Sequence, residues 1–234
     1  MVSTFKKQRN EFYHHLAHTI ELSSNRRDFT VEFCHEKRVL HIGCVDAGIM
    51  DARIEEHNFL HYQIGSVAKK LIGADIEKQG LERLSSEGFE VYHLDLEKDV
   101  GLLNNLSKQV DVIVIPEVIE HLDNVGNALD NIKSCAFNGD ILISTPNAFS
   151  FRSYKMIGKC VEMIHPDHNY YFSPTTLKTI LMKHGFSIER LVMYYWKTNG
   201  PIGQELQKVV TANPYFAEGM IAVVKDRSLK GCDG

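Results

Sequence analysis

Carboxylate and imidazole side chains occur together in one short stretch of the chain. Glu117, Glu120 and His121 lie within five residues, directly after an apolar run. If a helix begins near Glu117, spacings of three and four place all three side chains on one face of it. Such side chains bind a divalent cation or form an acid–base pair. Alternatively, Glu120 and His121 only cap and stabilise the helix. The residues leave these three interpretations open.

Two further histidines occur nearer the C-terminus. His165 and His168 flank Pro166 and Asp167, two residues that favour a turn. Functional groups often lie on such loops, and we expect this loop to lie over the same strand ends as Glu117. His168 is therefore a candidate general base, and equally a candidate metal ligand.

A glycine-bearing turn comes much earlier in the chain. The apolar run Val39–Ile42 ends at Gly43, and Gly48 follows. A strand followed by such a turn binds nucleotide-like ligands in α/β folds, because a residue without a Cβ lets the ligand approach the backbone. Asp75 ends the next apolar run and is suited to accept hydrogen bonds from ribose hydroxyls. The alternative is that Asp75 caps a helix at 77–87.

The segments that must position these residues alternate between strand and helix. Apolar runs predict strands at 37–43, 70–76, 89–94, 110–116, 139–147, 187–196 and 219–225. Helical patterns lie within 50–69 and at 77–87, 126–137 and 174–184, with a polar helix or turn at 97–109 and irregular chain at 148–170. This alternation predicts an open, doubly wound α/β sheet with its ligand site at the carboxyl ends of the strands. The last two strands have no obvious long helix between them, which suits an antiparallel closing strand.

Composition limits the class of protein. The 234 residues are 44% hydrophobic and suit one large domain, and a net charge of −4 indicates no large nucleic-acid footprint. The five scattered cysteines contain no CxxC pair, which indicates free thiols and a cytoplasmic protein. No apolar run reaches the roughly 18 residues of a membrane span. Residues 4–24 have apolar positions near helical spacing and predict an amphipathic N-terminal helix.

Several segments, taken in order, resemble one family. RVLHIGC, LIGADI, VYHLDLE, VDVIVIPEVIEHL, GDILISTPN and HPDHNYYFSPTTLKTILMKHGF are similar to the motifs of class I S-adenosylmethionine-dependent methyltransferases. The resemblance implies a Rossmann-like, doubly wound, seven-stranded and mostly parallel sheet with an antiparallel last strand. It divides the chain into an N-terminal helical extension (1–36), a methyltransferase domain (37–225) and a C-terminal tail (226–234).

The resemblance also implies a cofactor-binding set along the strand ends. Gly43 and Cys44 would line the methionine end of S-adenosylmethionine. Asp75, followed by Ile76, would bind the ribose, and Asp95 would bind the adenine amino group with Leu96 beside the ring. Pro116 and Glu117 would lie close to the transferred methyl group.

The first motif departs from the family pattern at two positions. His41 stands where an acidic residue is usual, and Val45 replaces a central glycine. His41 is either a core histidine or part of an altered site, and Asp46 is a substitute carboxylate. Val45 indicates either a different loop path or reduced cofactor affinity, so a degenerate member without turnover is one alternative.

The second constellation is similar to the metal site of small-RNA 3′-end 2′-O-methyltransferases. The matching residues are Glu117, Glu120, His121 and His168, which implies a divalent metal such as Mg²⁺ or Mn²⁺. The same EVIEH string also resembles ubiquinone-pathway and glycan O-methyltransferases, so it does not define the acceptor. Without a metal, His168, Glu117 and His121 would carry the acid–base chemistry.

We therefore expect O-methylation of a small molecule, a sugar or a nucleotide-linked sugar in glycan biosynthesis. RNA ribose methylation is the alternative, against which the acidic net charge argues. The oligomeric state stays undecided, and a homodimer is one possibility. The acceptor pocket would be walled by aromatic side chains, with basic residues at its mouth: Phe149, Phe151, Tyr154, Tyr170, Tyr171 and Phe172, and Arg152, Lys155 and Lys159. Core packing and a solvated basic face are the simpler accounts of these two groups.

Overall fold

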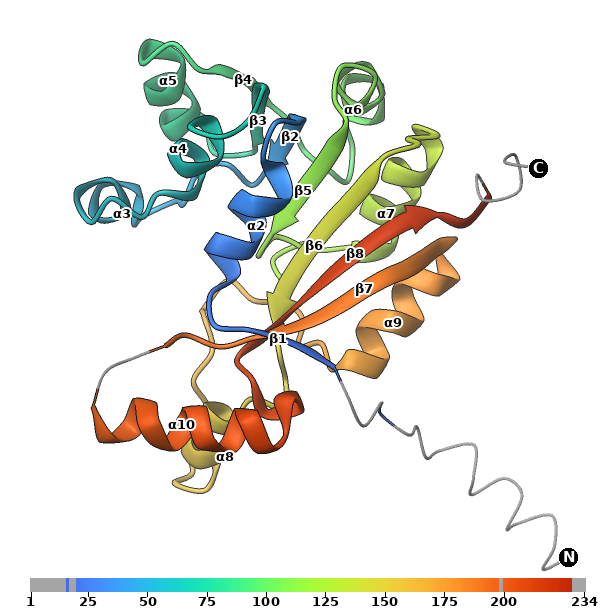
Figure 1. Ribbon diagram of the computed structural model, residues 1–234. Helices are drawn as coiled ribbons and strands as arrows, with labels where there is room; N and C mark the ends of the chain where they lie inside the picture. The colour runs from blue at the N-terminus through green and yellow to red at the C-terminus, as the bar shows by residue number, and fades with distance from the viewer. Residues whose placement is uncertain (1–15, 17–19, 198–199, 229–234) are drawn as a thin grey trace, which may run out of the picture.

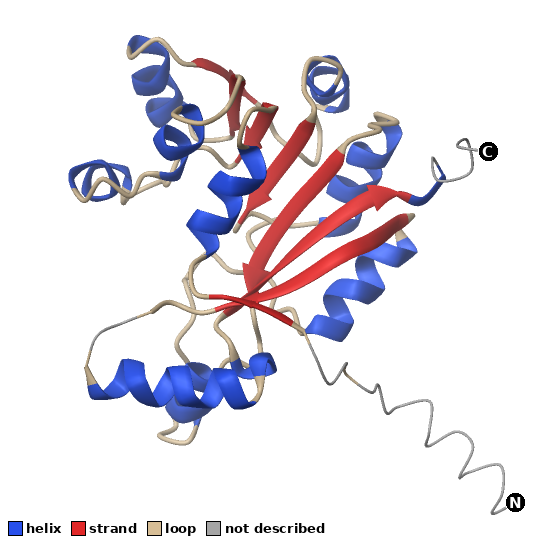
Figure 2. Cartoon of the chain, in the orientation of Figure 1, coloured by secondary structure: helices blue, strands red, loops and turns tan. Residues whose placement is uncertain are grey.

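A computed structural model describes residue 16 and residues 20–197 and 200–228. Its strands form one eight-stranded sheet in the order β1-β7-β8-β6-β5-β2-β3-β4, with helices on both sides (Figure 2). The strands are β1 (Glu21–Ser23), β2 (Arg38–Ile42), β3 (Lys70–Asp75), β4 (Glu90–His93), β5 (Val112–Pro116), β6 (Asp140–Pro146), β7 (Phe186–Tyr194) and β8 (Gly219–Asp226).

The helices connect these strands in the alternation that the sequence predicts. They are α2 (Arg26–Cys34), α3 (Met50–Glu55), α4 (Leu60–Gly65), α5 (Lys78–Ser86), α6 (Val100–Ser107), α7 (Val125–Ser134), α8 (Phe151–Ile157), α9 (Pro174–Lys183) and α10 (Pro201–Ala212), with a 3₁₀ turn η1 at Pro214–Phe216. Figure 1 shows α8 and α10 together beyond the carboxyl ends of β5 and β6.

The sheet confirms the predicted Rossmann-like fold class. Strands β4, β3, β2, β5 and β6 pair in parallel, and β8 runs antiparallel to both β6 and β7. The eighth strand, beyond the seven expected, is β1, which pairs in parallel with β7 at the sheet edge. Residues that precede Lys37 therefore contribute a strand and helix α2 to the fold. The division of the chain at residues 36 and 225 stays a prediction.

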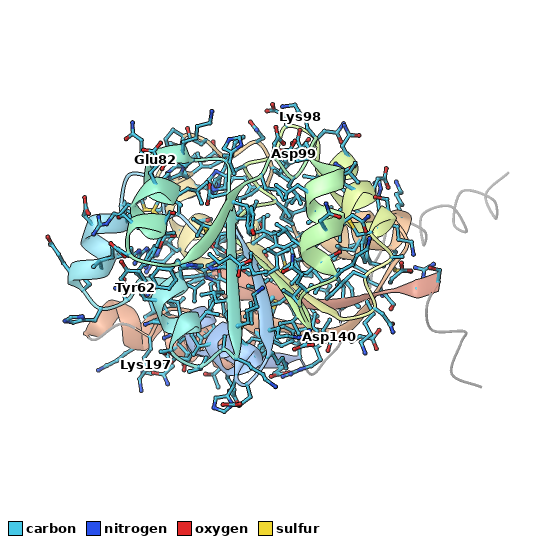
Figure 3. All side chains as sticks on the ribbon, turned by 90° about the horizontal axis from the view of Figure 1, so that it is seen from above. Tyr62, Glu82, Lys98, Asp99, Asp140 and Lys197 are labelled. Atoms are coloured by element: carbon cyan, nitrogen blue, oxygen red, sulfur yellow. The ribbon has the colours of Figure 1, made fainter. Side chains whose placement is uncertain are left out.

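Both faces of the sheet are buried because alternate residues of each central strand point to opposite sides. In β5, Val112 and Val114 pack with α2 and α4, whereas Ile113 and Ile115 pack with α6, α7 and α9. Figure 1 shows these two helix layers. Seen from above, side chains fill the space between the sheet and the helices on both faces (Figure 3).

Three secondary-structure predictions differ from the structure. Residues 148–170, predicted to be irregular, contain helix α8, which Ser150 caps at its N-terminus. Residues 21–23 form a strand, so the predicted helix over 4–24 is wrong there; its remainder lies almost entirely outside the described residues. Helix α10 occupies the segment in which no long helix was expected. Its Pro201 follows a left-handed Gly200 and stands in the first turn, where proline is favourable.

Two predictions from composition agree with the structure. Within the described ranges, no helix is long and apolar enough to cross a membrane. The four described cysteines are free, and three of them are buried: Cys34, Cys44 and Cys135. Cys232 lies outside the described residues.

Candidate active site

Glu117 follows strand β5 in a turn and not in the helix considered from its spacing. Its φ is +55°, and residues 117–121 form turns closed by the His121 N–H on the Val118 carbonyl. The Glu117 carboxylate accepts hydrogen bonds from the Ser144 hydroxyl at 2.8 Å and from the Tyr194 hydroxyl at 3.1 Å to each oxygen. Glu117 is therefore held in one orientation by side chains of β6 and β7.

Glu120 is separated from the other candidate metal ligands. Its side chain is buried, and neither carboxylate oxygen has a hydrogen bond of normal geometry among the described residues. Burial, and then the negative charge of Glu117, raise the pKa of Glu120 well above its usual value. A carboxyl in that environment is held neutral, and the helical face expected to join Glu117, Glu120 and His121 does not form.

Three imidazoles come together instead. Ring nitrogens of His121, His165 and His168 all lie within 4.8 Å of one another, and the rings of His121 and His168 meet edge to face at 4.5 Å. This group contains His121 and His168 of the four predicted metal ligands, adds His165, and does not include Glu117 or Glu120. Burial, together with neighbouring imidazoles, lowers the pKa of both His121 and His168, so these rings favour the neutral, electron-donating form.

Hydrogen bonds fasten the histidine loop to the segment after β5. The Asn169 N–H donates to the Glu120 carbonyl at 2.8 Å, and its side-chain amide donates to the carbonyl of His121 at 3.1 Å. The Tyr170 hydroxyl donates to the carbonyl of Asp123 at 2.8 Å. These contacts explain how residues 44 positions or more apart in the chain form one cluster.

A cavity of about 210 Å³ opens beside this cluster at the carboxyl ends of β5, β6 and β7. We call it the strand-tip cavity. Its lining combines a carboxylate, two imidazoles, three aromatic rings and an ion pair: Glu117, His165, His168, Tyr171, Tyr194, Trp196 and Arg152–Glu218. Arg152 Nε lies 3.0 Å from Glu218 Oε1, so this charge is compensated within the protein.

The glycine turn after β2 requires glycine for its backbone conformation and for the packing of Val118. Gly43 has a φ of +77°, and a Cβ there would collide with Val118. Val45 is buried and packs against helix α5 at Gly80, where a Cβ would collide with it. The missing glycine at position 45 is thus compensated by a glycine at position 80, and the loop closes with Val45 turned into the core.

Asp75 organises this turn. Its carboxylate accepts the Val45 N–H at 2.8 Å and the Glu77 N–H at 3.0 Å, while Glu77 itself caps helix α5. Burial raises the pKa of Asp75. Ile76, directly beside it, is 62% exposed, an environment suited to an apolar contact with a ligand ring. The ribose role of Asp75 stays a prediction, but the alternative role as the cap of α5 belongs to Glu77.

The other predicted cofactor residues lie along the same edge of the sheet. The Asp95 carboxylate accepts the Glu97 N–H at 2.9 Å and pairs with Lys98 at 2.7 Å, which lowers its pKa. The remaining members are buried at or near the strand ends: Cys44, Leu96 and Pro116. Their roles toward a ligand remain predictions.

His41 is a core residue. It is 1% exposed, and its Nδ1 lies 3.1 Å from Nδ1 of His61 on α4. Burial first, then His61 and Arg26, lower the pKa of His41 well below its usual value. Burial lowers the pKa of His61 to about 4. Asp46 lies in the loop after β2 and pairs with Arg53 at 3.9 Å. Its role as a substitute for the usual acidic residue of β2 stays a prediction.

Most of the aromatic and basic residues expected around the acceptor pocket make other contacts. Of the six aromatic residues expected to wall the acceptor pocket, Tyr171 lines the strand-tip cavity, whereas Phe149 lines a separate groove and Phe172 is in the core. Lys155 pairs with Glu205 at 2.7 Å. Tyr194 and Trp196 line the cavity but were not predicted, although the cluster YYW at the end of a predicted strand is a usable signal. Arg26 of α2, whose Nε lies 3.9 Å from Glu117 Oε1, was not predicted either, because no local signal for it exists.

Comparison with known proteins agrees with this geometry. A methyltransferase domain model matches residues 8–191. This chain belongs to the methyltransferase family. It is an S-adenosylmethionine-dependent methyltransferase, and the glycine turn and acidic strand ends fit that cofactor. No curated protein sequence matches the chain.

Solved structures of methyltransferases share the fold. The small RNA methyltransferase HEN1 matches with a TM-score of 0.56 and 17% identity, over 92% of this chain and 26% of HEN1. The magnesium protoporphyrin IX methyltransferase ChlM from Synechocystis, with bound S-adenosylhomocysteine, matches with a TM-score of 0.52 and 15% identity, over 95% of this chain and 94% of ChlM. The N-methyltransferase NodS from Bradyrhizobium japonicum, in complex with S-adenosylhomocysteine, matches with a TM-score of 0.50 and 13% identity, over 86% of this chain and 85% of NodS. This chain thus spans about a quarter of the length of HEN1.

Proposed function

We propose that this methyltransferase acts in the cytoplasm on a hydroxyl of a sugar or a nucleotide-linked sugar. The observation that supports the proposal is the lining of the strand-tip cavity. Glu117 and Glu218 are carboxylates suited to accept hydrogen bonds from hydroxyl groups, and Tyr171 and Trp196 offer flat surfaces for the apolar face of a ring. A volume of about 210 Å³ suits one ring of that size.

His168 is the general base of the proposed reaction. The hydroxyl oxygen attacks the sulfonium methyl group, the carbon–sulfur bond breaks, and the hydroxyl proton passes to the neutral imidazole. Burial and the two neighbouring histidines lower the pKa of His168, so the ring is free to accept a proton at neutral pH. Glu117, fixed by Ser144 and Tyr194, would orient the hydroxyl along the methyl–sulfur axis.

A screen of acceptor pools tests this proposal. The purified protein is incubated with S-adenosylmethionine carrying a labelled methyl group and with pools of nucleotide sugars, free sugars, quinol precursors and short RNAs. Mass spectrometry then locates the label. The proposal expects the label on a sugar hydroxyl, and label confined to RNA or to nitrogen would contradict it.

The histidine cluster favours one second candidate, metal-assisted 2′-O-methylation of an RNA ribose. In this proposal His121, His165 and His168 would hold the ion, because their ring nitrogens lie within 4.8 Å of one another, whereas Glu120 is buried and not part of that group. Three imidazoles suit Mn²⁺ or another transition metal better than Mg²⁺. A bound divalent ion would supply positive charge that polarises a ribose hydroxyl.

Chelation and RNA binding separate the two candidates. The metal-assisted function expects turnover to cease after exhaustive chelation and to return with Mn²⁺. It also expects short RNA to bind with an affinity that falls steeply with salt. Full activity after chelation, without salt-dependent RNA binding, would exclude the second candidate and leave His168 as the base.

A further inference from the structure

Arg26 is a buried cation without a matching hydrogen-bond acceptor. It is the first residue of α2, its side chain is 11% exposed, and its Nε has no hydrogen-bond partner among the described residues. The guanidinium lies 5.9 Å from the centre of the Trp196 ring. Burying a guanidinium without acceptors is costly, so its retention at this place calls for a ligand.

Glu117 does not satisfy this guanidinium. Its Oε1 lies 3.9 Å from Arg26 Nε, which is too long for a hydrogen bond. The carboxylate is already held by Ser144 at 2.8 Å and by Tyr194 at 3.1 Å to each oxygen. Because these bonds fix its orientation, Glu117 balances the charge of Arg26 but leaves the buried Nε–H of Arg26 without an acceptor among the described residues.

Arg26 stands between the two halves of the site. Burial acts against its charge, and the nearby groups that favour the charge are Glu117, Glu120 and Tyr194 on the acceptor side and Asp46 of the glycine loop. An α-amino acid carries one carboxylate and one ammonium group. The arrangement of Arg26 with Asp46 and Glu117 offers one cation and two anions, which is the complementary pattern.

We propose that Arg26 binds the α-carboxylate of the methionine portion of S-adenosylmethionine. The planar guanidinium matches a carboxylate with two parallel hydrogen bonds, and the ring of Trp196 supports it from one face. Helix α2, which precedes the glycine turn, thereby becomes part of the cofactor site. The assignment requires that the cofactor lie along the strand ends, and it is independent of which acceptor is methylated.

Calorimetry with two ligands tests the assignment without any acceptor. S-Adenosylhomocysteine carries the amino-acid portion, and 5′-methylthioadenosine lacks it. The variant Arg26→Met keeps the side-chain bulk against Trp196 and removes the charge. We expect it to bind S-adenosylhomocysteine about ten-fold more weakly or worse, since charge-assisted hydrogen bonds are lost. Its affinity for 5′-methylthioadenosine should stay within about two-fold of wild type, because that ligand makes no contact with Arg26.

A matched control and a milder variant protect the test. Arg27, the next residue of α2, lies 5.1 Å from the Trp196 ring centre, and Arg27→Met should change neither affinity. Arg26→Lys keeps the positive charge but cannot form the bidentate pair with a carboxylate. If Arg26→Met does not fold, the affinities of Arg26→Lys for S-adenosylhomocysteine and 5′-methylthioadenosine are compared instead.

Three results would overturn the assignment. The first is equal weakening of both ligands, which indicates a structural role. The second is unchanged S-adenosylhomocysteine binding. The third is unchanged cofactor binding with a raised KM only for acceptors that carry a carboxylate, which moves the anion to the acceptor.

Discussion

His168 carries the most specific chemical expectation at the scale of single residues. We expect His168→Ala to lower kcat about 100-fold or more, as loss of a general base does, while S-adenosylhomocysteine binds as in the wild type. The exposed His35 on the far end of α2 provides the control, His35→Gln, which should leave kcat unchanged. Wild-type turnover in His168→Ala would remove this residue from the mechanism.

The pH profile gives a second test of the same residue. The active form is the neutral imidazole, and burial with two neighbouring imidazoles lowers the pKa of His168 below its ordinary value of 6.5. Activity should therefore persist below pH 6.5 and fall only as the pH drops through the lowered pKa. A kcat–pH profile with its acid limb above pH 6.5 would contradict this environment for His168.

Sequence reasoning succeeded for residues whose chemistry depends on local order and failed where it depends on distant contacts. Gly43 and Asp75 lie where the strand–turn pattern predicted, because a parallel sheet brings its carboxyl ends to one edge. The helix expected to align Glu117 with Glu120 does not form, because Glu117 has a left-handed conformation; the ligand role of Glu120 stays a prediction. Arg26 could not be found, since only the folded chain brings α2 to the ends of β5 and β7.

At the scale of elements, the contact between the glycine loop and α5 determines where the loop lies. A Cβ at Gly80 would collide with Val45, so Gly80→Ala should displace the loop, lower stability by about 1–3 kcal/mol and weaken S-adenosylhomocysteine binding. The double variant Gly80→Ala, Val45→Ala should recover both losses, because it removes the colliding methyl groups. Calorimetry and urea unfolding measure the two quantities. Failure of the double variant to recover either one would show that Val45 is not the partner of Gly80.

The buried histidine pair makes the packing of α4 on β2 sensitive to pH. In the folded protein the pKa of His61 falls to about 4 and that of His41 falls well below 6.5, whereas both are ordinary when unfolded. The unfolded chain therefore binds more protons as the pH falls from 6.5 towards 4. The free energy of unfolding should decrease there by about 1.4 kcal/mol per pH unit for each histidine.

The variant His61→Gln isolates this contribution, since it leaves one titrating ring in place of two. Urea unfolding between pH 7 and 5 should give a shallower decline than in the wild type. Parallel curves for the two proteins would contradict the buried, neutral state of the pair.

Elements were predictable where their pattern is continuous and not where a turn interrupts it. The Val/Ile run of β5 and the capped helix α9 agree with the sequence analysis. The apolar spacing within 50–69 predicted helix there, but it does not reveal the left-handed His57 that separates α3 from α4. Helix α10 was missed because Gly200–Pro201 suggests irregular chain, although the same pair also starts a helix.

At the scale of the whole molecule, helix α2, which precedes Lys37, belongs to the folded core. Thr30 and Cys34 on α2 are 0% exposed, and Phe29 and Phe33 cover the face formed by β2 and β5. We expect removal of residues 1–36 to expose that face and to yield a chain without a cooperative thermal transition. A truncated protein that melts like the full chain would show that α2 is an addition to a self-sufficient domain.

The central claim is that the cofactor lies along one edge of the sheet, between the glycine turn and the strand-tip cavity. A crystal structure of the full chain with S-adenosylhomocysteine tests it most directly. We expect the adenosine at Asp75, Ile76 and Asp95, and the sulfur pointing towards Glu117. Ordered ligand at any other place, or none under conditions in which calorimetry shows saturation, would contradict the account.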